Sequence, residues 1–249
     1  MRETKKQGTG TFYGVGVGPG PRGLFPVSAV EALLCCDIIF CPKADTKEYS
    51  FARQCLNGID IPEEKFEEIP FHMDPNRDLL RGHYRQLADQ IAEHLKQGKN
   101  VGCLTLGDSM TYSTYGYTIA ALLEVLPQVE HHTFPGITSY AHLAATFNWP
   151  LGEGKERVLI LPCPDEMENL RNDIDTHDVV VLMKIGKRLT DVLQVLDSMK
   201  IKEHCVFGRR MGLEDEILCN DLSRLPEEES LGYLSTMLIR KNPREKRHL

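Results

Sequence analysis

The stretch GVGVGPGPRG, residues 14–23, joins an apolar run to a turn rich in glycine and proline. Its last six residues fit the G-x-G-x-x-G pattern of a dinucleotide-binding turn, which holds pyrophosphate through backbone N–H groups and needs an acidic residue at the end of the second strand. Pro19 and Pro21 have no N–H group, and Asp37 stands at the start of the next apolar run. The stretch therefore predicts a strand that ends in a stiff Gly-Pro loop, and it disfavours a dinucleotide site.

The segments that follow predict a layered α/β fold. Residues 11–18 are predicted to form a strand, a helix begins near Pro26, and DIIFCP (37–42) forms a second strand. A strand, a helix and a strand in this order indicate two parallel strands joined by a crossover. The alternation continues with an amphipathic helix at 77–97 and, among later elements, a strand at 100–107, which favours α/β architecture with parallel sheets.

The second half continues the alternation and predicts a second domain. Its apolar runs predict four strands, at 157–162, 178–185, 204–210 and 234–242, with a helix at 189–200. Residues 164–178 are acidic and are expected to be irregular. We expect an N-terminal domain of residues 1–133 and a C-terminal domain of residues 134–249.

The charge and the apolar pattern disfavour several classes of protein. The 249 residues carry a formal net charge of -7, which argues against nonspecific binding of nucleic acid. No apolar run approaches the roughly 20 residues needed to cross a bilayer, and residues 1–10 lack the apolar core of a signal peptide. The eight cysteines form no C-x-x-C pair or zinc-finger spacing, so we expect buried, reduced thiols, no metal site and a cytoplasmic location.

Three segments rich in Gly, Pro, Ser and Thr are expected at one edge of the first sheet. They are residues 18–23, 106–116 and 134–140. The first two follow the strands predicted at 11–18 and 100–107, and the third follows another short predicted strand that ends near Phe134. Ligands of open α/β sheets bind beyond the carboxyl ends of the strands, where small residues let the backbone approach a polar ligand. These segments are therefore the predicted walls of a small-molecule site.

Four segments, in the same order along the chain, resemble the tetrapyrrole methylases, a family of S-adenosylmethionine-dependent enzymes also called class III methyltransferases. They are FYGVGVGPGP (12–21), LTLGDSMTYSTYGY (104–117), TFPGITSYAHLAA (133–145) and VVVLMKIGK (179–187). The resemblance implies two α/β domains with S-adenosylmethionine in the cleft between them, usually in a homodimer. Two departures stand out: Pro21-Arg22-Gly23 replaces the usual Asp-Pro-Glu, and Ser109 replaces the proline that commonly follows Gly-Asp.

The continuation WPLGEG (149–154) is similar to the branch that methylates C20 of precorrin-2 or cobalt-precorrin-2 in cobalamin synthesis. Matching positions imply a cofactor site made of Pro19, Leu106, Gly107, Asp108, Thr111, Thr138, Ser139 and Met183, with Arg210 near the adenine. Structural explanations exist for several of these residues. Asp108 could cap a turn, Thr138 and Ser139 could cap the next helix, and Met183 could be a core residue.

The implied acceptor is a meso carbon of a reduced tetrapyrrole, already nucleophilic, so the enzyme must chiefly align the reactants and exclude water. Asp108, Tyr112 or water could later remove the meso proton. Tyr112 and Tyr115 are each candidates for substrate contact, or else core aromatics.

The carboxylates of such a substrate require cations. Arg77, Arg81 and Arg85 repeat along one helix face, which is either a substrate contact or a solvated surface. A second group comprises Arg209 and Arg210 with three further cations, Lys184, Lys187 and Arg188.

Other functions remain open at this point. The same loops occur in methylases that act on other corrin positions, on diphthine precursors or on ribosomal RNA. A catalytically silent tetrapyrrole-binding protein and a dinucleotide-dependent oxidoreductase are further alternatives, the last disfavoured by Pro19 and Pro21.

Overall fold

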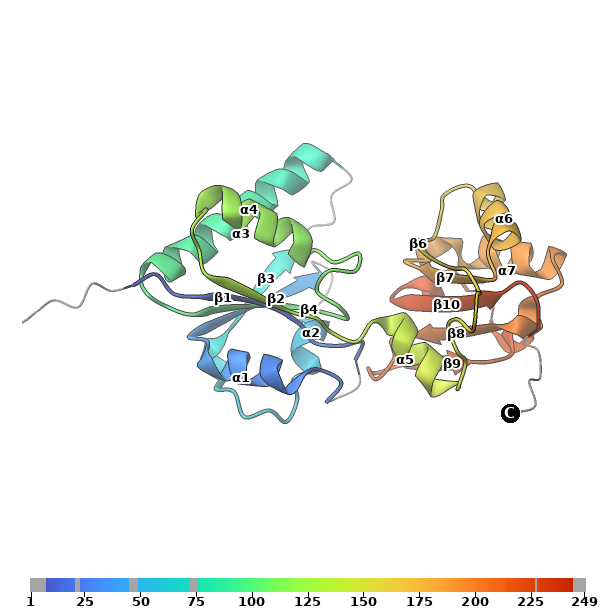
Figure 1. Ribbon diagram of the computed structural model, residues 1–249, viewed down its shortest axis with the longest axis horizontal. Coiled ribbons are helices and arrows are strands. Elements are labelled where there is room, and N and C mark those ends of the chain that lie inside the picture. Colours follow the sequence, from blue (N-terminus) through green and yellow to red (C-terminus); the bar gives the residue numbers. More distant parts are fainter. Residues whose placement is uncertain (1–7, 21–22, 45–48, 72–75, 227, 244–249) are drawn as a thin grey trace, which may run out of the picture. The chain divides into compact units, whose positions relative to one another are not determined.

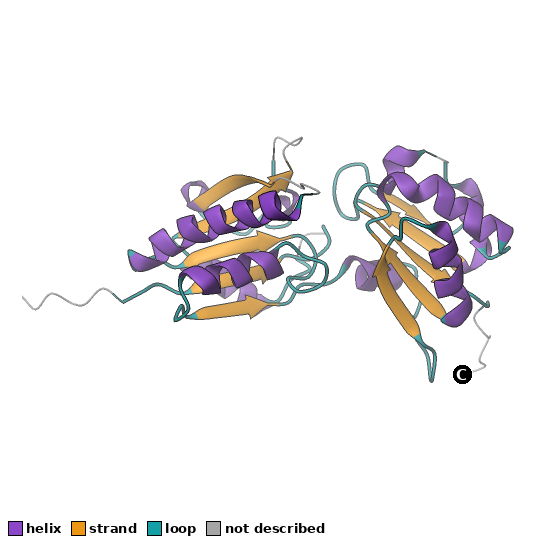
Figure 2. Cartoon of the chain, turned by 90° about the horizontal axis from the view of Figure 1, so that it is seen from above, coloured by secondary structure: helices purple, strands orange, loops and turns teal. Residues whose placement is uncertain are grey.

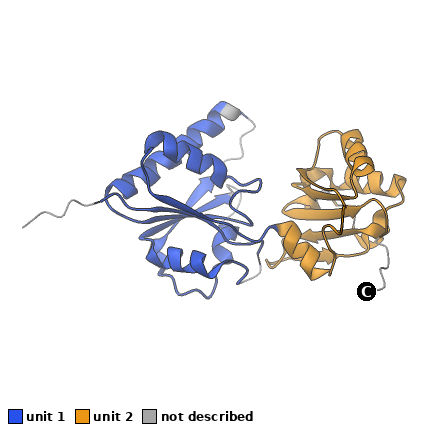
Figure 3. Ribbon diagram, viewed as in Figure 1, with its two compact units in different colours: residues 1–138 blue, residues 139–249 orange. Residues whose placement is uncertain are grey.

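The computed structural model describes residues 8–20, 23–44, 49–71, 76–226 and 228–243 (Figure 1). Helices flank the strands of both sheets (Figure 2). The chain divides into two compact units, residues 1–138 and 139–249, and each unit contains one five-stranded sheet (Figure 3). The expected fold class, two α/β domains, is confirmed. No helix in the described parts of the chain is long and apolar enough to cross a membrane.

The sheet of unit 1 is entirely parallel, with strand order β3-β2-β4-β1-β5. Its strands are β1 (Phe12–Gly16), β2 (Ile38–Ala44), β3 (Phe66–Phe71), β4 (Val101–Thr105) and β5 (His131–Phe134). Helices α3 (Arg77–Lys96) and α4 (Tyr115–Val125) cover one face, and α1 (Val27–Cys35) and the short α2 (Phe51–Gln54) cover the other (Figure 1). A 3-10 turn, Glu63–Lys65, precedes β3.

Local sequence explains two features of unit 1. Asn76 caps the long helix α3, because its side-chain oxygen accepts hydrogen bonds from the backbone N–H groups of Asp78 and Leu79. Gly14 in β1 leaves room for a core aromatic, since a Cβ atom at this position would lie 2.0 Å from the ring of Tyr115. The start of α3 therefore follows from an N-cap, and the packing of Tyr115 against β1 follows from a missing side chain.

The sheet of unit 2 is mixed, with strand order β6-β7-β10-β8-β9. Its strands are β6 (Val158–Pro162), β7 (Val179–Met183), β8 (Cys205–Arg209), β9 (Ile217–Cys219) and β10 (Ser235–Arg240). Only β6 and β7 pair in parallel. The last strand, β10, inserts between β7 and β8 and runs antiparallel to both, and β8 and β9 are also antiparallel. The expectation of parallel sheets is therefore wrong for this unit.

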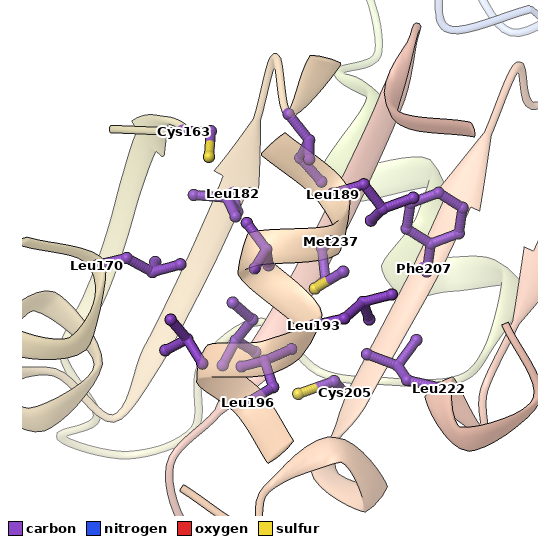
Figure 4. Packing of buried hydrophobic residues seen from close by; sticks show 14 of the residues in the cluster. Cys163, Leu170, Leu182, Leu189, Leu193, Leu196, Cys205, Phe207, Leu222 and Met237 are labelled. Carbon is purple, nitrogen blue, oxygen red and sulfur yellow. The ribbon is translucent and has the colours of Figure 1, made fainter. Parts of the chain in front are cut away.

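Helices cover both faces of this second sheet. They are α5 (Ser139–Thr146) on one face and α6 (Met167–Thr176) with α7 (Leu189–Ser198) on the other, and short 3-10 turns occupy Gly186–Arg188, Lys202–His204, Leu222–Arg224 and Glu229–Gly232. Figure 4 shows the larger core, in which Leu189, Leu193 and Leu196 of α7 pack beside Leu182, Phe207 and Met237 of the strands.

Helix α6 lies where an irregular acidic segment was expected, so that expectation is wrong. Leu170 and Ile174, four residues apart, are buried in the core, while its acidic residues stay at the surface. A helix of ten residues supplies too few apolar residues for the periodicity to stand out beside so much charge.

All eight cysteines are free thiols, and six of them are buried. Burial raises the pKa of Cys36, Cys55, Cys103 and Cys205 to about 12, so these thiols stay protonated and unreactive at neutral pH.

Candidate active site

Three loops meet at the carboxyl edge of the unit 1 sheet. They follow β4, β1 and β5, which are neighbours in the sheet. Gly18 and Gly107 exchange backbone hydrogen bonds of 3.1 and 2.6 Å, and both have positive φ angles, of 80° and 76°. A Cβ atom on Gly136 would lie 2.0 Å from the carbonyl oxygen of Gly107, so the loops touch backbone to backbone. Residues 21 and 22 of the first loop lie outside the described residues.

Asp108 ties two of these loops together through its carboxylate. Oδ1 accepts hydrogen bonds from the N–H of Met110 (3.0 Å) and the hydroxyl of Thr111 (2.8 Å). Oδ2 accepts a hydrogen bond from the N–H of Gly136, at 3.1 Å, in the loop after β5. Burial alone would raise the pKa of Asp108, but these donors outweigh it and hold the pKa below the ordinary value. A carboxylate so well solvated by the protein is a weak proton acceptor.

Ser109 adds a second tether between the same loops. Its side chain is fully buried, and its hydroxyl donates to the carbonyl oxygen of Phe134 at the end of β5, at 2.9 Å. The serine that departs from the family pattern therefore makes a contact that proline has no donor to make.

Tyr112 and Tyr115 have opposite environments. Tyr112 is 44% exposed, and its φ of 50° is rare for an aromatic residue. Tyr115 is 1% exposed and lies in the core on α4, with its hydroxyl 2.7 Å from that of Thr133 and its ring stacked on Phe12. Substrate contact by Tyr115 is therefore corrected to a core role, because the side chain is buried and its hydroxyl has a partner. Burial raises the pKa of Tyr115 to about 12.

The other cofactor residues expected in unit 1 gather in the same loops. Pro19 is buried beside Gly18, Leu106 packs partly on the core, and Thr111 belongs to the Asp108 turn. Thr138 is half-buried and is the last residue of unit 1. Gly107 has open space where a Cβ atom would stand, so a ligand can approach its Cα closely.

In unit 2, two predicted site residues meet at Thr236 of β10. The hydroxyl of Ser139, the first residue of α5, lies 2.8 Å from that of Thr236. Met183 is the residue of β7 that pairs with Thr236 across the sheet. Thr236 was missed in the sequence analysis. The sequence feature that points to it is a pair of hydroxyl residues, Ser235-Thr236, at the start of an apolar strand, and the structure buries both.

Three arginines of the predicted second cationic group, Arg188, Arg209 and Arg210, are engaged within unit 2. Arg210 has a positive φ of 48°, is buried, and donates from Nη1 to Asp215 Oδ2 at 3.0 Å. Arg209 donates to the carbonyl oxygen of Asp215, and Arg188 donates to Asp165 and to the carbonyl oxygen of Lys184. These guanidinium groups hold loops in place.

Arg81 and Arg85 of α3 are at the surface. Arg81 is 80% exposed, 4.0 Å from a carboxylate oxygen of Glu124, and Arg85 lies 3.4 Å from Asp89. The side chain of Arg77 lies outside the described residues. Among the residues that the structure describes, no group of three or more His, Cys, Asp and Glu side chains gathers as metal ligands.

The fold and the loop junction agree with the comparisons with known proteins. The family model of the tetrapyrrole (corrin/porphyrin) methylases matches residues 11–225. The chain therefore belongs to the tetrapyrrole methylase family. A cobalt precorrin-4 methyltransferase structure superposes with a TM-score of 0.69 over 94% of this chain and 96% of its own, at 18% identity.

Two relatives are more specific. The chain is 31% identical to the Methanocaldococcus jannaschii protein named probable cobalt-precorrin-2 C(20)-methyltransferase, over 92% of this chain and 95% of that protein. It is 25% identical to the precorrin-2 C(20)-methyltransferase of a Sinorhizobium species, over 93% of this chain and 96% of that protein.

Proposed function

We propose that the protein transfers a methyl group from S-adenosylmethionine to C20 of precorrin-2 or cobalt-precorrin-2 in corrin-ring synthesis. The observation that carries this proposal is the junction of the three loops at Gly18, Gly107 and Gly136, braced by Asp108. The relatives named for this reaction align with almost the whole chain.

The residues present fit such a methyl donor. S-adenosylmethionine supplies an electrophilic methyl group on a positively charged sulfur. The open space beside the Cα of Gly107 lets a ligand approach the loop closely, although the N–H and carbonyl groups of Gly107 are bonded to Gly18. The hydroxyls of Ser139 and Thr236 and the thioether of Met183 offer polar and polarisable contacts. Pro19, Leu106, Thr111, Thr138 and Arg210 complete the proposed set.

The acceptor carbon needs no strong base, because pyrrole nitrogen lone pairs make it enamine-like. The protein's main contribution is then alignment and exclusion of water, which is worth on the order of 7–11 kcal/mol for well-oriented reactants. Asp108 suits the task of holding two loops in register better than that of removing a proton, because its carboxylate already accepts three hydrogen bonds. Tyr112 or water is the better candidate for the final proton transfer.

An anaerobic assay tests the proposal and separates the two substrates. The purified protein is given S-adenosylmethionine with either metal-free or cobalt-loaded precorrin-2, and the product is analysed by mass spectrometry and NMR. The expected result is one added methyl group at C20 with one of the two substrates. Methylation at another position would assign the chain to a different branch of the family. No product and no donor binding would refute the proposal.

The proposal extends to a cytoplasmic location, expected from the cysteine pattern, and to a homodimer, which the family resemblance implies. Sedimentation velocity of the full chain tests the dimer, with a mass twice the 28.2 kDa of one chain as the expected result.

A further inference from the structure

Tyr112 is held in a backbone conformation that its side chain disfavours. Its φ of 50° lies in the left-handed region, which costs a non-glycine residue about 1 kcal/mol or more. Both neighbours are pinned. Thr111 donates to Asp108, and the hydroxyl of Ser113 lies 3.2 Å from that of Thr105 and accepts from the N–H of Tyr115. The loop is thus rigid on both sides of a strained residue, and strain of this kind is typical of ligand-binding positions.

The loop after β4, which contains Tyr112, and the loop after β5 expose other large apolar side chains. Met110 is 65% exposed, and Ile137, next to Gly136, is also exposed. The bond from Gly136 N–H to Asp108 holds the segments that carry them together. Tyr115, the first residue of α4 and three residues beyond Tyr112, is buried. Of these two tyrosines, only Tyr112 is therefore exposed. Exposed apolar side chains grouped on braced loops, rather than scattered, indicate a binding surface.

We infer that Met110, Tyr112 and Ile137 form a contact surface for the face of the tetrapyrrole macrocycle, an inference that rests on the proposed function. A macrocycle is a broad, flat, conjugated ligand. An aromatic ring and a thioether both make favourable contacts with such a π system. In this role the ring of Tyr112 supplies the contact, and Asp108 and Ser109 set its position. The phenolic hydroxyl is dispensable for this contact.

Four variants separate the ring, the hydroxyl and the backbone strain. Tyr112→Phe keeps the ring, Tyr112→Ala removes it, and Tyr112→Gly removes it while relieving the positive φ. Tyr117→Ala is the matched control, because Tyr117 is 63% exposed on α4, where its ring lies 5.2 Å from that of Tyr84. For each variant we would measure the denaturant midpoint of unfolding and the dissociation constant for S-adenosylmethionine. The KM for precorrin-2 and its dissociation constant would be measured as well, the dissociation constant by anaerobic equilibrium dialysis.

The expected result is that Tyr112→Gly and Tyr112→Ala raise the precorrin-2 KM and dissociation constant at least tenfold, with donor affinity within twofold of wild type. Tyr112→Gly should also unfold at a higher denaturant midpoint than Tyr112→Ala. Tyr112→Phe and Tyr117→Ala should bind precorrin-2 like wild type.

Three outcomes would overturn the inference: unchanged precorrin-2 binding in the glycine and alanine variants, a matching loss of donor affinity, or loss of binding in Tyr112→Phe. Wild type that binds precorrin-2 without methylating C20 would refute the proposed function and leave this inference standing. Wild type that does not bind it would refute both.

Discussion

At the residue scale, the adjacent side chains of Asp108 and Ser109 make different hydrogen bonds. The carboxylate of Asp108 gathers three donors from two loops, and the buried hydroxyl of Ser109 caps the carbonyl oxygen of Phe134. One contact reaches the loop after β5 and the other reaches the last residue of β5, so the junction depends on side-chain hydrogen bonds as well as on close-packed glycines. The charge of Asp108 is therefore expected to affect stability directly.

Replacing Asp108 with Asn is expected to destabilise the protein by about 1 kcal/mol at pH 7, because a neutral amide accepts weaker hydrogen bonds and its NH₂ group cannot accept from Gly136. The folded pKa lies below the ordinary 3.8, so the carboxylate contributes its full stability above that value and loses it as the pH falls through the folded pKa. Urea titrations should therefore show a constant difference between wild type and variant from pH 8 to pH 5, which shrinks below about pH 4. A difference that grows in acid would contradict this role.

Replacing Tyr115 with Phe tests the correction of this residue from substrate contact to core. Loss of the hydroxyl bonded to Thr133 should cost about 1 kcal/mol of unfolding free energy. The KM for the tetrapyrrole should not change, because the side chain is buried. Tyr117→Phe, at an exposed position, should leave both quantities unchanged. A raised KM at unchanged stability would restore the substrate role of Tyr115.

At the element scale, most strands and helices of unit 1 follow from local patterns that the sequence displays, whereas α2 and β3 were not predicted. Apolar runs, Gly-Pro turns and the Asn76 cap each act over a few residues, so β1, α3 and β4 could be predicted. The direction of β10 could not be predicted, because its insertion between β7 and β8 depends on pairing with strands that are far away in the sequence. The same limit applies to the site: the loop residues could be named, but Thr236 and the burial of Tyr115 required the fold.

The segment WPLGEG, which indicated the C20 branch, packs against one buried arginine, Arg240. Arg240 at the end of β10 donates to the carboxylate of Glu156 and, at 2.8 Å, to the carbonyl oxygen of Pro150. Its guanidinium also lies 4.8 Å from the ring centroid of Trp149. The segment between α5 and β6 therefore wraps around Arg240, which is a structural use of the motif.

Replacing Glu156 with Ala should lower the unfolding free energy by about 2–3 kcal/mol, below the 3–5 of a fully buried pair, because Glu156 is partly exposed. Combining it with Arg240→Leu should cost less than the sum of the two single variants, with a coupling of about 1–3 kcal/mol. Denaturant unfolding of the four proteins in this cycle measures the coupling, and Glu203→Ala, at an exposed position, is the control. Additive losses would show that the pair is not coupled.

At the scale of the whole molecule, an acidic chain has to present cations locally to bind a substrate rich in carboxylates. The net charge is -7, and the arginines of unit 2 described above are engaged with loop carboxylates and carbonyls. The exposed arginines of α3 are better placed. Helix α3 follows β3, so its first turns, including Arg81, lie toward the carboxyl edge of the sheet, where the three loops meet.

Reversing the charge of Arg81 to Glu is expected to raise the tetrapyrrole KM severalfold, because a carboxylate near the bound substrate repels its acetate and propionate groups. Donor affinity should not change, and stability should change little, since the exposed pair with Glu124 is weak. Lys96→Glu makes the same charge change at the opposite end of α3 and should leave KM unaltered. The effect of Arg81→Glu should also weaken as salt rises from 0.05 to about 0.5 M, because screening shortens the reach of exposed charges. Equal effects of the two variants would attribute the change to net charge, and an unchanged KM would leave α3 as a solvated surface.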